Sequence, residues 1–131
     1  MGIEGKKYPP VSVELEADKV AEFAWAIGAD PHEGVPPTYA AVYCLGATAP
    51  QLFGDKEAAV DFARLLHAEQ EFDWTRHPKV GDKVRSQARV TSDIHRRGMR
   101  FVTFETDTTS GKGDPICHSR ALFVIRGGPQ P

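Results

Sequence analysis

A carboxylate and an imidazole lie close together in a segment that should form no regular element. Asp30 and His32 stand two residues apart in the run ADPHEGVPP, which directly follows Gly28. The prolines and the further glycine in this run predict a loop. Aspartate and histidine are among the side chains that transfer protons in enzymes. Asp30 and His32 are therefore the first candidates for chemistry, although such a loop pair is more commonly a solvated pair without a chemical role.

The remaining histidines and the cysteines do not suggest a metal centre. The histidines, at positions 32, 67, 77, 95 and 118, are scattered and show no ligand spacing. Cys44 and Cys117 are the only cysteines, and each lies in an apolar context that is typical of buried, reduced thiols. We therefore expect neither a metal nor another cofactor.

The segment that follows the pair must position it, and this segment carries no charge. Residues 34–54 read GVPPTYAAVYCLGATAPQLFG. Pro36 and Pro37 impose an extended approach and then a backbone suited to the first turn of a helix. Residues 38–47 are apolar or small on every side, which is typical of a helix buried inside a protein or a membrane. The prolines and the short length argue against a membrane span, so we expect a short buried helix that ends before Pro50.

The segments on either side of this helix predict one antiparallel sheet. Alternation indicates a strand at 11–15, and apolar residues at helical spacing indicate amphipathic helices at 17–28 and 56–66. The pattern then alternates and predicts four strands with short connections, at 66–75, 83–94, 99–108 and 116–126. We expect a single α+β domain over residues 1–131, with the sheet curled around the helix and with loose tails at 1–10 and 127–131.

The bulk properties exclude some classes of function. A net charge of −2 and a pI near 6.2 give no electrostatic reason to bind nucleic acid. The opening residues, MGIEGKKYPP, contain no apolar run of the kind found in a signal peptide. The sequence thus predicts a cytoplasmic protein that binds neither nucleic acid nor membrane.

Four motifs, in order, resemble the MaoC-like dehydratase superfamily, and most closely its FAS1-like, or N-terminal MaoC dehydratase, branch. That branch has F-A-x-A-x-G-D-P at the end of a helix, A-P-P-T-F at the start of the central helix, H-G-E-Q-x-F/Y on the second strand and x-P-x-x-G-D in the following turn. The matching segments here are 23–31, 35–39, 67–72 and 77–82. The resemblance covers about residues 11–126 and implies a hot-dog fold, in which an antiparallel sheet curls around a central helix.

The resemblance also implies a substrate and a reaction. Active relatives hydrate trans-2-enoyl thioesters, or dehydrate (R)-3-hydroxyacyl thioesters, that are carried on coenzyme A or acyl carrier protein. Their aspartate and histidine lie five positions apart in a G-D-x-N-P-x-H segment and act as acid and base. Backbone N–H groups at the start of the central helix, here near Thr38 and Tyr39, would hold the thioester oxygen.

This chain departs from the pattern at the dyad. When the motifs are aligned on Pro31, Gly28 stands at the position of the aspartate and Glu33 at that of the histidine. Asp30 and His32 would then be a displaced dyad. Some relatives are heterodimers in which one subunit carries the dyad and the other shapes the acyl tunnel. The resemblance thus implies the dyad-poor subunit of a homodimeric or heterodimeric enzyme; the alternatives are a non-catalytic acyl-binding hot-dog protein and a thioesterase-like enzyme.

Other residues are candidates for binding substrate. Tyr39 and Tyr43, four apart on the central helix, could wall an acyl tunnel, although simple core packing explains them equally well. His67 could line a pocket or lie on a polar face of its strand. Gln70, if it points inward, needs a hydrogen-bond partner from the backbone or a ligand. The basic segment 95–100 could attract the phosphates of coenzyme A or an acidic carrier protein, or could be a solvated hairpin tip.

Overall fold

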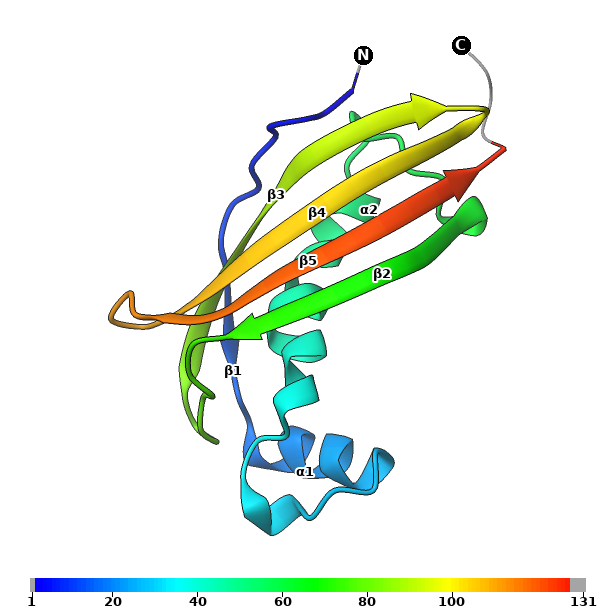
Figure 1. Ribbon diagram of the computed structural model, residues 1–131. Coiled ribbons are helices and arrows are strands. Elements are labelled where there is room, and N and C mark those ends of the chain that lie inside the picture. Colours follow the sequence, from blue (N-terminus) through cyan, green and yellow to red (C-terminus); the bar gives the residue numbers. More distant parts are fainter. Residues whose placement is uncertain (1, 128–131) are drawn as a thin grey trace.

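The computed structural model describes residues 2–127, which form one antiparallel sheet lying along a helix (Figure 1). The first elements are strand β1 (Val11–Glu14) and helix α1 (Ala17–Ala26). A loop with a short 3-10 turn (Pro31–Glu33) leads to a helical segment at 37–53, called the central helix below. Four long strands follow: β2 (Leu65–Trp74), β3 (Lys83–Arg96), β4 (Met99–Ser110) and β5 (Pro115–Arg126). The expected α+β hot-dog fold is confirmed.

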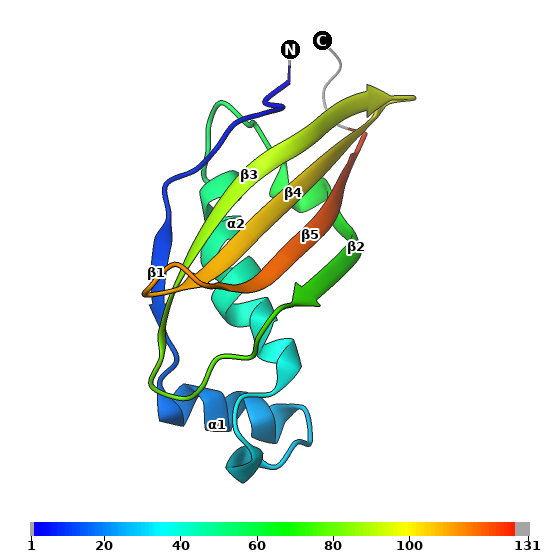
Figure 2. The same cartoon turned by 60° about the vertical axis from the view of Figure 1, so that its left-hand side comes forward.

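The sheet has the strand order β1-β3-β4-β5-β2, and every neighbouring pair is antiparallel. Figure 2 shows the sheet curving over one side of the central helix, with β1 and β2 at its two edges. The four predicted long strands are all present, with ends moved by a few residues. An irregularity between Val90 and Ser92 turns Ile94 outward, so this residue leaves the inner face to which alternation would assign it.

The central helix combines three helical forms. A 3-10 turn (Pro37–Tyr39) is followed by a π-helical turn (Ala41–Gly46) and then by helix α2 (Ala47–Phe53). The prediction that it ends before Pro50 is wrong, because Pro50 lies inside α2 and the helix continues to Phe53. A Cβ at Gly46 would lie 2.7 Å from the carbonyl oxygen of Ala41, so the π-helical turn favours glycine there.

The two sides of the central helix differ in their environment. The side that faces the sheet is fully buried and consists of Tyr39, Ala40, Tyr43, Cys44, Thr48, Ala49 and Leu52. The opposite side is exposed in the single chain and is also without charge: Thr38, Ala41, Val42 and Gly46 lie there. The composition predicted a helix that is buried on all sides, but within this chain only the side that faces the sheet is buried.

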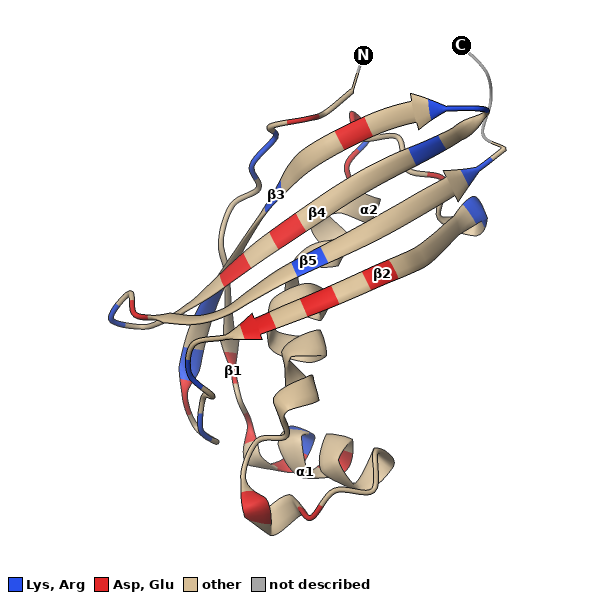
Figure 3. Cartoon of the chain, in the orientation of Figure 1, with Lys and Arg blue, Asp and Glu red and all other residues tan. Residues whose placement is uncertain are grey.

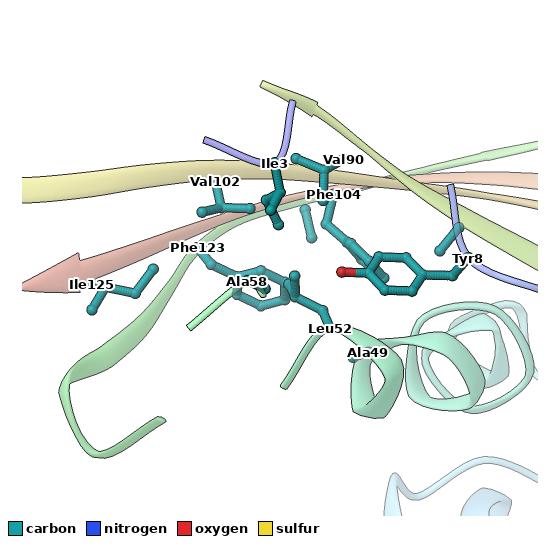
Figure 4. Packing of buried hydrophobic residues seen from close by; sticks show 12 residues of the cluster. Ile3, Tyr8, Ala49, Leu52, Ala58, Val90, Val102, Phe104, Phe123 and Ile125 are labelled. Carbon is teal, nitrogen blue, oxygen red and sulfur yellow. The ribbon is translucent and has the colours of Figure 1, made fainter. Parts of the chain in front are cut away.

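Two groups of apolar side chains hold the central helix on the sheet. Near its C-terminal end, Leu52 packs below Phe104 and Phe123, whose ring centroids are 6.2 Å apart (Figure 4). At its N-terminal end, Tyr39 and Tyr43 pack with a second group from β1, α1, β3 and β5. Full burial of a large apolar side chain contributes about 1.5–3 kcal/mol, so these contacts dominate the attachment of the helix.

The amphipathic helix predicted at 56–66 does not form, and this prediction is wrong. Ala59 adopts a positive φ of 50°, which no helix interior accommodates. The carbonyl groups of Ala58 and Ala59, which would accept helical hydrogen bonds, instead accept from the guanidinium of Arg100 on β4. Only a 3-10 turn at Phe62–Arg64 remains before β2 begins.

Residues 2–10 are also not the loose tail that was predicted. The N–H of Gly5 donates to the carbonyl of Val90 (2.7 Å) and the N–H of Tyr8 to that of Ala88 (2.9 Å). Ile3 and Tyr8 are buried in the core. The reason is that β1 pairs only with residues 83–86, which leaves the rest of the edge of β3 available for this segment. The second predicted tail, 127–131, lies outside the described residues except for Gly127.

Candidate functional site

Asp30 and His32 bind each other at the surface of the loop that precedes the central helix. The carboxylate of Asp30 accepts a hydrogen bond from the backbone N–H of His32 (2.8 Å) and lies 3.2 Å from its Nδ1. The two side chains are 52% and 92% exposed. Hydrogen bonds from the backbone and then the ring of His32 hold the pKa of Asp30 below its usual range. Asp30 is thus an ionised residue that caps the 3-10 turn Pro31–Glu33.

The first turn of the central helix offers fewer donors than the sequence implied. Pro36 and Pro37 have no N–H, and the N–H of Tyr39 already donates to the carbonyl of Pro36 (2.9 Å). The N–H of Ala40 bonds to the carbonyls of Pro37 and Thr38. Thr38 therefore carries the one remaining backbone donor of this turn, and its side chain is exposed.

The two tyrosines of the central helix are core residues within this chain. The ring of Tyr39 packs edge-on against Phe23 of α1, with centroids 5.1 Å apart. Tyr43 is 1% exposed, and burial raises the pKa of its phenol. No group within residues 2–127 bonds to the Tyr43 hydroxyl or to the indole N–H of Trp74, although both atoms are buried. The role of the tyrosines in binding an acyl chain stays a prediction.

His67 and Gln70 come together on β2. The Nε2 of His67 lies 3.0 Å from the amide oxygen of Gln70. The amide nitrogen of Gln70 donates to the hydroxyl of Ser119 (2.8 Å) and to the carbonyl of Glu71 (3.0 Å). The side chain of Gln70 is thus satisfied by the protein itself, and its binding of substrate also stays a prediction.

Small hydroxyl side chains line the inner face of the sheet under the central helix, and sequence reasoning missed them. Ser86 donates to the carbonyl of Tyr43 (2.7 Å) and lies 2.6 Å from the hydroxyl of Thr108. Thr48 lies 3.0 Å from the hydroxyl of Thr106. The sequence did offer a signal for these hydrogen bonds, because serine and threonine occupy inward-facing positions of β3 and β4. These bonds fix the helix to the sheet without charge.

The basic hairpin at 95–100 lies far from the start of the central helix. Figures 1 and 2 show the β3–β4 connection at one end of the sheet and the N-terminal end of the central helix near the other. Arg100 is also occupied, because it forms an ion pair with Asp93 (2.9 Å). The hairpin is therefore remote from the first turn of the central helix in this chain.

Two further features are absent from the part of the chain that the structure describes. Residues 2–127 contain no helix that is both long enough and apolar enough to cross a bilayer. Over the same range, no three histidine, cysteine, aspartate or glutamate side chains gather as the ligands of a metal ion would. Cys44 and Cys117 are free thiols in the core.

Comparisons with known proteins agree with this architecture. The family described as the FAS1-like dehydratase domain region matches residues 3–119. A UPF0336 protein of Saccharopolyspora erythraea is 30% identical over 139 aligned positions, which cover 94% of this chain and 88% of that protein.

Two solved structures from Mycobacterium tuberculosis share the fold. The HadBC complex, a (3R)-hydroxyacyl-ACP dehydratase, superposes with a TM-score of 0.75 at 19% identity, covering 95% of this chain and 98% of that chain. The ChsH1–ChsH2 complex gives a TM-score of 0.70 at 11% identity, covering 95% and 86%. With a family match over nearly its whole length, the chain belongs to the family described as the FAS1-like dehydratase domain region, and it shares its fold with these solved structures.

Proposed function

We propose that this chain is the dyad-poor subunit of a dimeric enzyme that hydrates enoyl thioesters or dehydrates (R)-3-hydroxyacyl thioesters. The observation that carries the proposal is the position of Asp30 and His32. Their side chains bind each other, and that of His32 is 92% exposed. An acid–base pair must hold its groups on one reacting centre to within about 1 Å, and two surface side chains that bind each other do not converge on such a centre.

A second hot-dog chain is the partner that suits the exposed surfaces. β2 is an edge strand, and an unpaired edge invites another strand. The uncharged outer side of the central helix, around Ala41 and Val42, is also uncovered. A partner that joins edge to edge at β2 and packs on this side of the helix would cover both. HadBC and ChsH1–ChsH2 are themselves complexes, which supports a partner chain here.

The chemical division of labour follows from what this chain retains. The backbone N–H of Thr38 would donate a hydrogen bond to the thioester oxygen and so stabilise the negative charge that develops there. The partner would supply the aspartate and histidine that transfer protons. Tyr39 and Tyr43 would shape the part of the tunnel formed by this subunit.

Two other functions use the same fold. A non-catalytic acyl carrier is favoured by the outward position of Asp30 and His32, because such a protein needs no dyad. A thioesterase-like enzyme would add water at the thioester carbonyl carbon and release the free acid and the thiol, so it would not need an enoyl double bond. Native mass spectrometry that finds a retained acyl ligand, with no turnover of any thioester, would favour the carrier.

The direct test is reconstitution. The chain is assayed with crotonyl-CoA and longer enoyl-CoA substrates, alone and mixed with a hot-dog chain that contains a G-D-x-N-P-x-H segment. The proposal expects hydration of long enoyl chains only in the mixture, and expects no hydration when the histidine of the partner's dyad is replaced. Absence of hydration in every mixture, or full activity of this chain alone, would contradict the proposal.

A further inference from the structure

A pocket of ≈ 360 Å³ lies between the connection from β2 to β3 and the turn from β4 to β5. Three cationic side chains line it, each from a different segment: Arg76 from the connection, Lys83 from the start of β3 and Lys112 from the turn. In Figure 3, basic segments gather at this end of the sheet, on the β4–β5 turn and around the start of β3. The three cations therefore line one pocket, although they come from different segments.

The two carboxylates of the pocket are partly occupied by other groups. Asp114 lies 4.0 Å from Arg76, and Asp82 accepts a hydrogen bond from the backbone N–H of Lys79 (2.8 Å). Within residues 2–127, Lys83 and Lys112 form no ion pair. With three cations and two carboxylates the lining has a net positive charge, although the chain as a whole has a charge of −2. This charge favours an anion.

The walls of the pocket are fixed by backbone hydrogen bonds. The N–H groups of Thr75 and Arg76 both donate to the carbonyl of Ile116, at 2.8 and 3.2 Å. In the turn, the N–H groups of Lys112 and Asp114 donate to the hydroxyl of Ser110, at 3.2 and 3.1 Å. A ligand would thus meet cations whose backbone positions are set before binding, which lowers the entropic cost of binding.

The floor of the pocket connects it to the start of the central helix. Val84 and Ile116 line the pocket and pack in the same buried group as Tyr39 and Ala40. The pocket therefore lies at the end of the sheet where the central helix begins (Figure 1). The basic hairpin at 95–100 lies at the other end, so it cannot serve the same ligand.

We propose that this pocket binds the phosphate groups of coenzyme A, with Arg76, Lys83 and Lys112 as their partners. The assignment rests on the proposed function, because an acyl thioester at Thr38 must carry its phosphates to a nearby surface. Lysine and arginine recognise phosphate through charge-assisted hydrogen bonds. The volume is within the range of small-molecule pockets, roughly 300–1,000 Å³, and favours a nucleotide over the broad acidic surface of a carrier protein.

The test measures binding without catalysis. Coenzyme A, and pantetheine as a probe without phosphates, are titrated by calorimetry into the full chain and into the double variant Lys83→Gln/Lys112→Gln. Both lysines are exposed, so the variant should keep its fold and its unfolding temperature. We expect affinity for coenzyme A to fall by at least about tenfold, since the loss of even one charge-assisted hydrogen bond has roughly that effect. Pantetheine binding should not change.

The matched control is Arg96→Gln/Arg97→Gln in the hairpin, which should leave the affinity for coenzyme A within about twofold. The proposal is overturned if the wild-type chain does not bind coenzyme A, or if the pocket variant binds coenzyme A as well as wild type. It is equally overturned if the hairpin variant loses as much affinity for coenzyme A as the pocket variant does. It is also overturned if a carrier protein binds and coenzyme A does not. A chain that binds coenzyme A through these lysines but supports no hydration with a partner would refute the proposed function and leave the pocket assigned.

Discussion

Arg100 and Asp93 form a buried ion pair on which three separate segments depend. The guanidinium of Arg100 donates to both carboxylate oxygens of Asp93, at 2.9 Å each, and the backbone N–H of Ile3 donates to the same carboxylate at 2.9 Å. Arg100 also donates to the carbonyls of Ala58 and Ala59. The side chains of Arg100 and Asp93 are only 12% and 0% exposed. We therefore expect Arg100→Met to be severely destabilising.

The magnitude follows from the buried charge that remains. Removing one partner of a buried ion pair costs about 3–5 kcal/mol, because the other charge is left uncompensated. The total free energy of unfolding of a domain of this size is about 5–15 kcal/mol. The melting temperature should therefore fall by roughly 10–20 °C. Arg97→Met, at the exposed hairpin tip, is the control and should change stability by less than about 0.5 kcal/mol. Urea denaturation and thermal unfolding measure both variants.

The pH dependence provides an independent check on Asp93. Burial by itself would raise the pKa of this carboxyl, but the hydrogen bonds from Arg100 and Ile3 outweigh burial and lower it. A lowered pKa adds stability that is present above the unfolded pKa and is lost as the pH falls through the folded pKa. Asp93→Asn should therefore be most costly near neutral pH, and in the Arg100→Met background it should restore part of the loss. The reasoning is refuted if Arg100→Met loses less than about 1 kcal/mol, or if the loss does not depend on Asp93.

Three further predictions concern the central helix and the outer face of the sheet. Gly46→Ala should cost about 1–3 kcal/mol in urea denaturation, because its Cβ would meet the Ala41 carbonyl, whereas Gly111→Ala, with 4.0 Å of space, should be nearly neutral; equal effects would contradict this. Partial burial disfavours the charged form of His118, but hydrogen bonds to Asp107 and Glu105 outweigh burial and raise its pKa. The stability that the charged ring contributes is therefore present below the pKa of the unfolded state and is lost as the pH rises through the pKa of the folded state. His118→Gln should therefore cost about 0.5–1 kcal/mol near pH 6 and almost nothing near pH 9, a small effect because the side chain is 36% exposed; equal losses at both pH values would disprove the assignment. Val42→Asp should cost the single chain no more than about 1–2 kcal/mol, because the side chain is 39% exposed and so only partly buried, but it should abolish complex formation with the partner in size-exclusion chromatography. A stable mixed complex would argue against a partner on this side of the helix.

The periodicity of the sequence predicts most of the fold because its signals are local. Alternation over long segments places β2 to β5 within a few residues of their ends. The absence of charge in segment 34–54 likewise marks a buried element, and the central helix lies within this segment. Such patterns appear in a sequence when each strand or helix buries one face in the core, and here the strands and the central helix all do so.

The failures arise where a distant residue decides the local structure. Residues 56–66 have a helical pattern, but Arg100 takes the carbonyls of Ala58 and Ala59 and a turn results. Residues 2–10 look like a tail, but the uncovered edge of β3 pairs with them. Neither effect can be seen without the strand order of the sheet, which periodicity does not reveal.

The site is less predictable than the fold. The sequence identified Asp30 and His32 by type, and the structure adds that they bind each other at the surface. Arg76 and Lys83 flank the 77–82 motif, but Lys112 comes from a turn about thirty residues further along the chain, so the sequence does not show that the three share a pocket. The cations in the 95–100 hairpin were contiguous and therefore more visible, but they lie at the wrong end of the sheet.

The central claim is that the protons are transferred by a partner and not by Asp30 and His32. The most direct measurement is the rate at which enoyl-CoA is hydrated by the reconstituted two-chain complex, compared between wild type and Asp30→Asn/His32→Gln. Exposed side chains that touch no reacting atom should be replaceable, so the account predicts equal rates within about twofold. A loss of about a hundredfold or more, the effect expected on removal of a general acid or base, would contradict it.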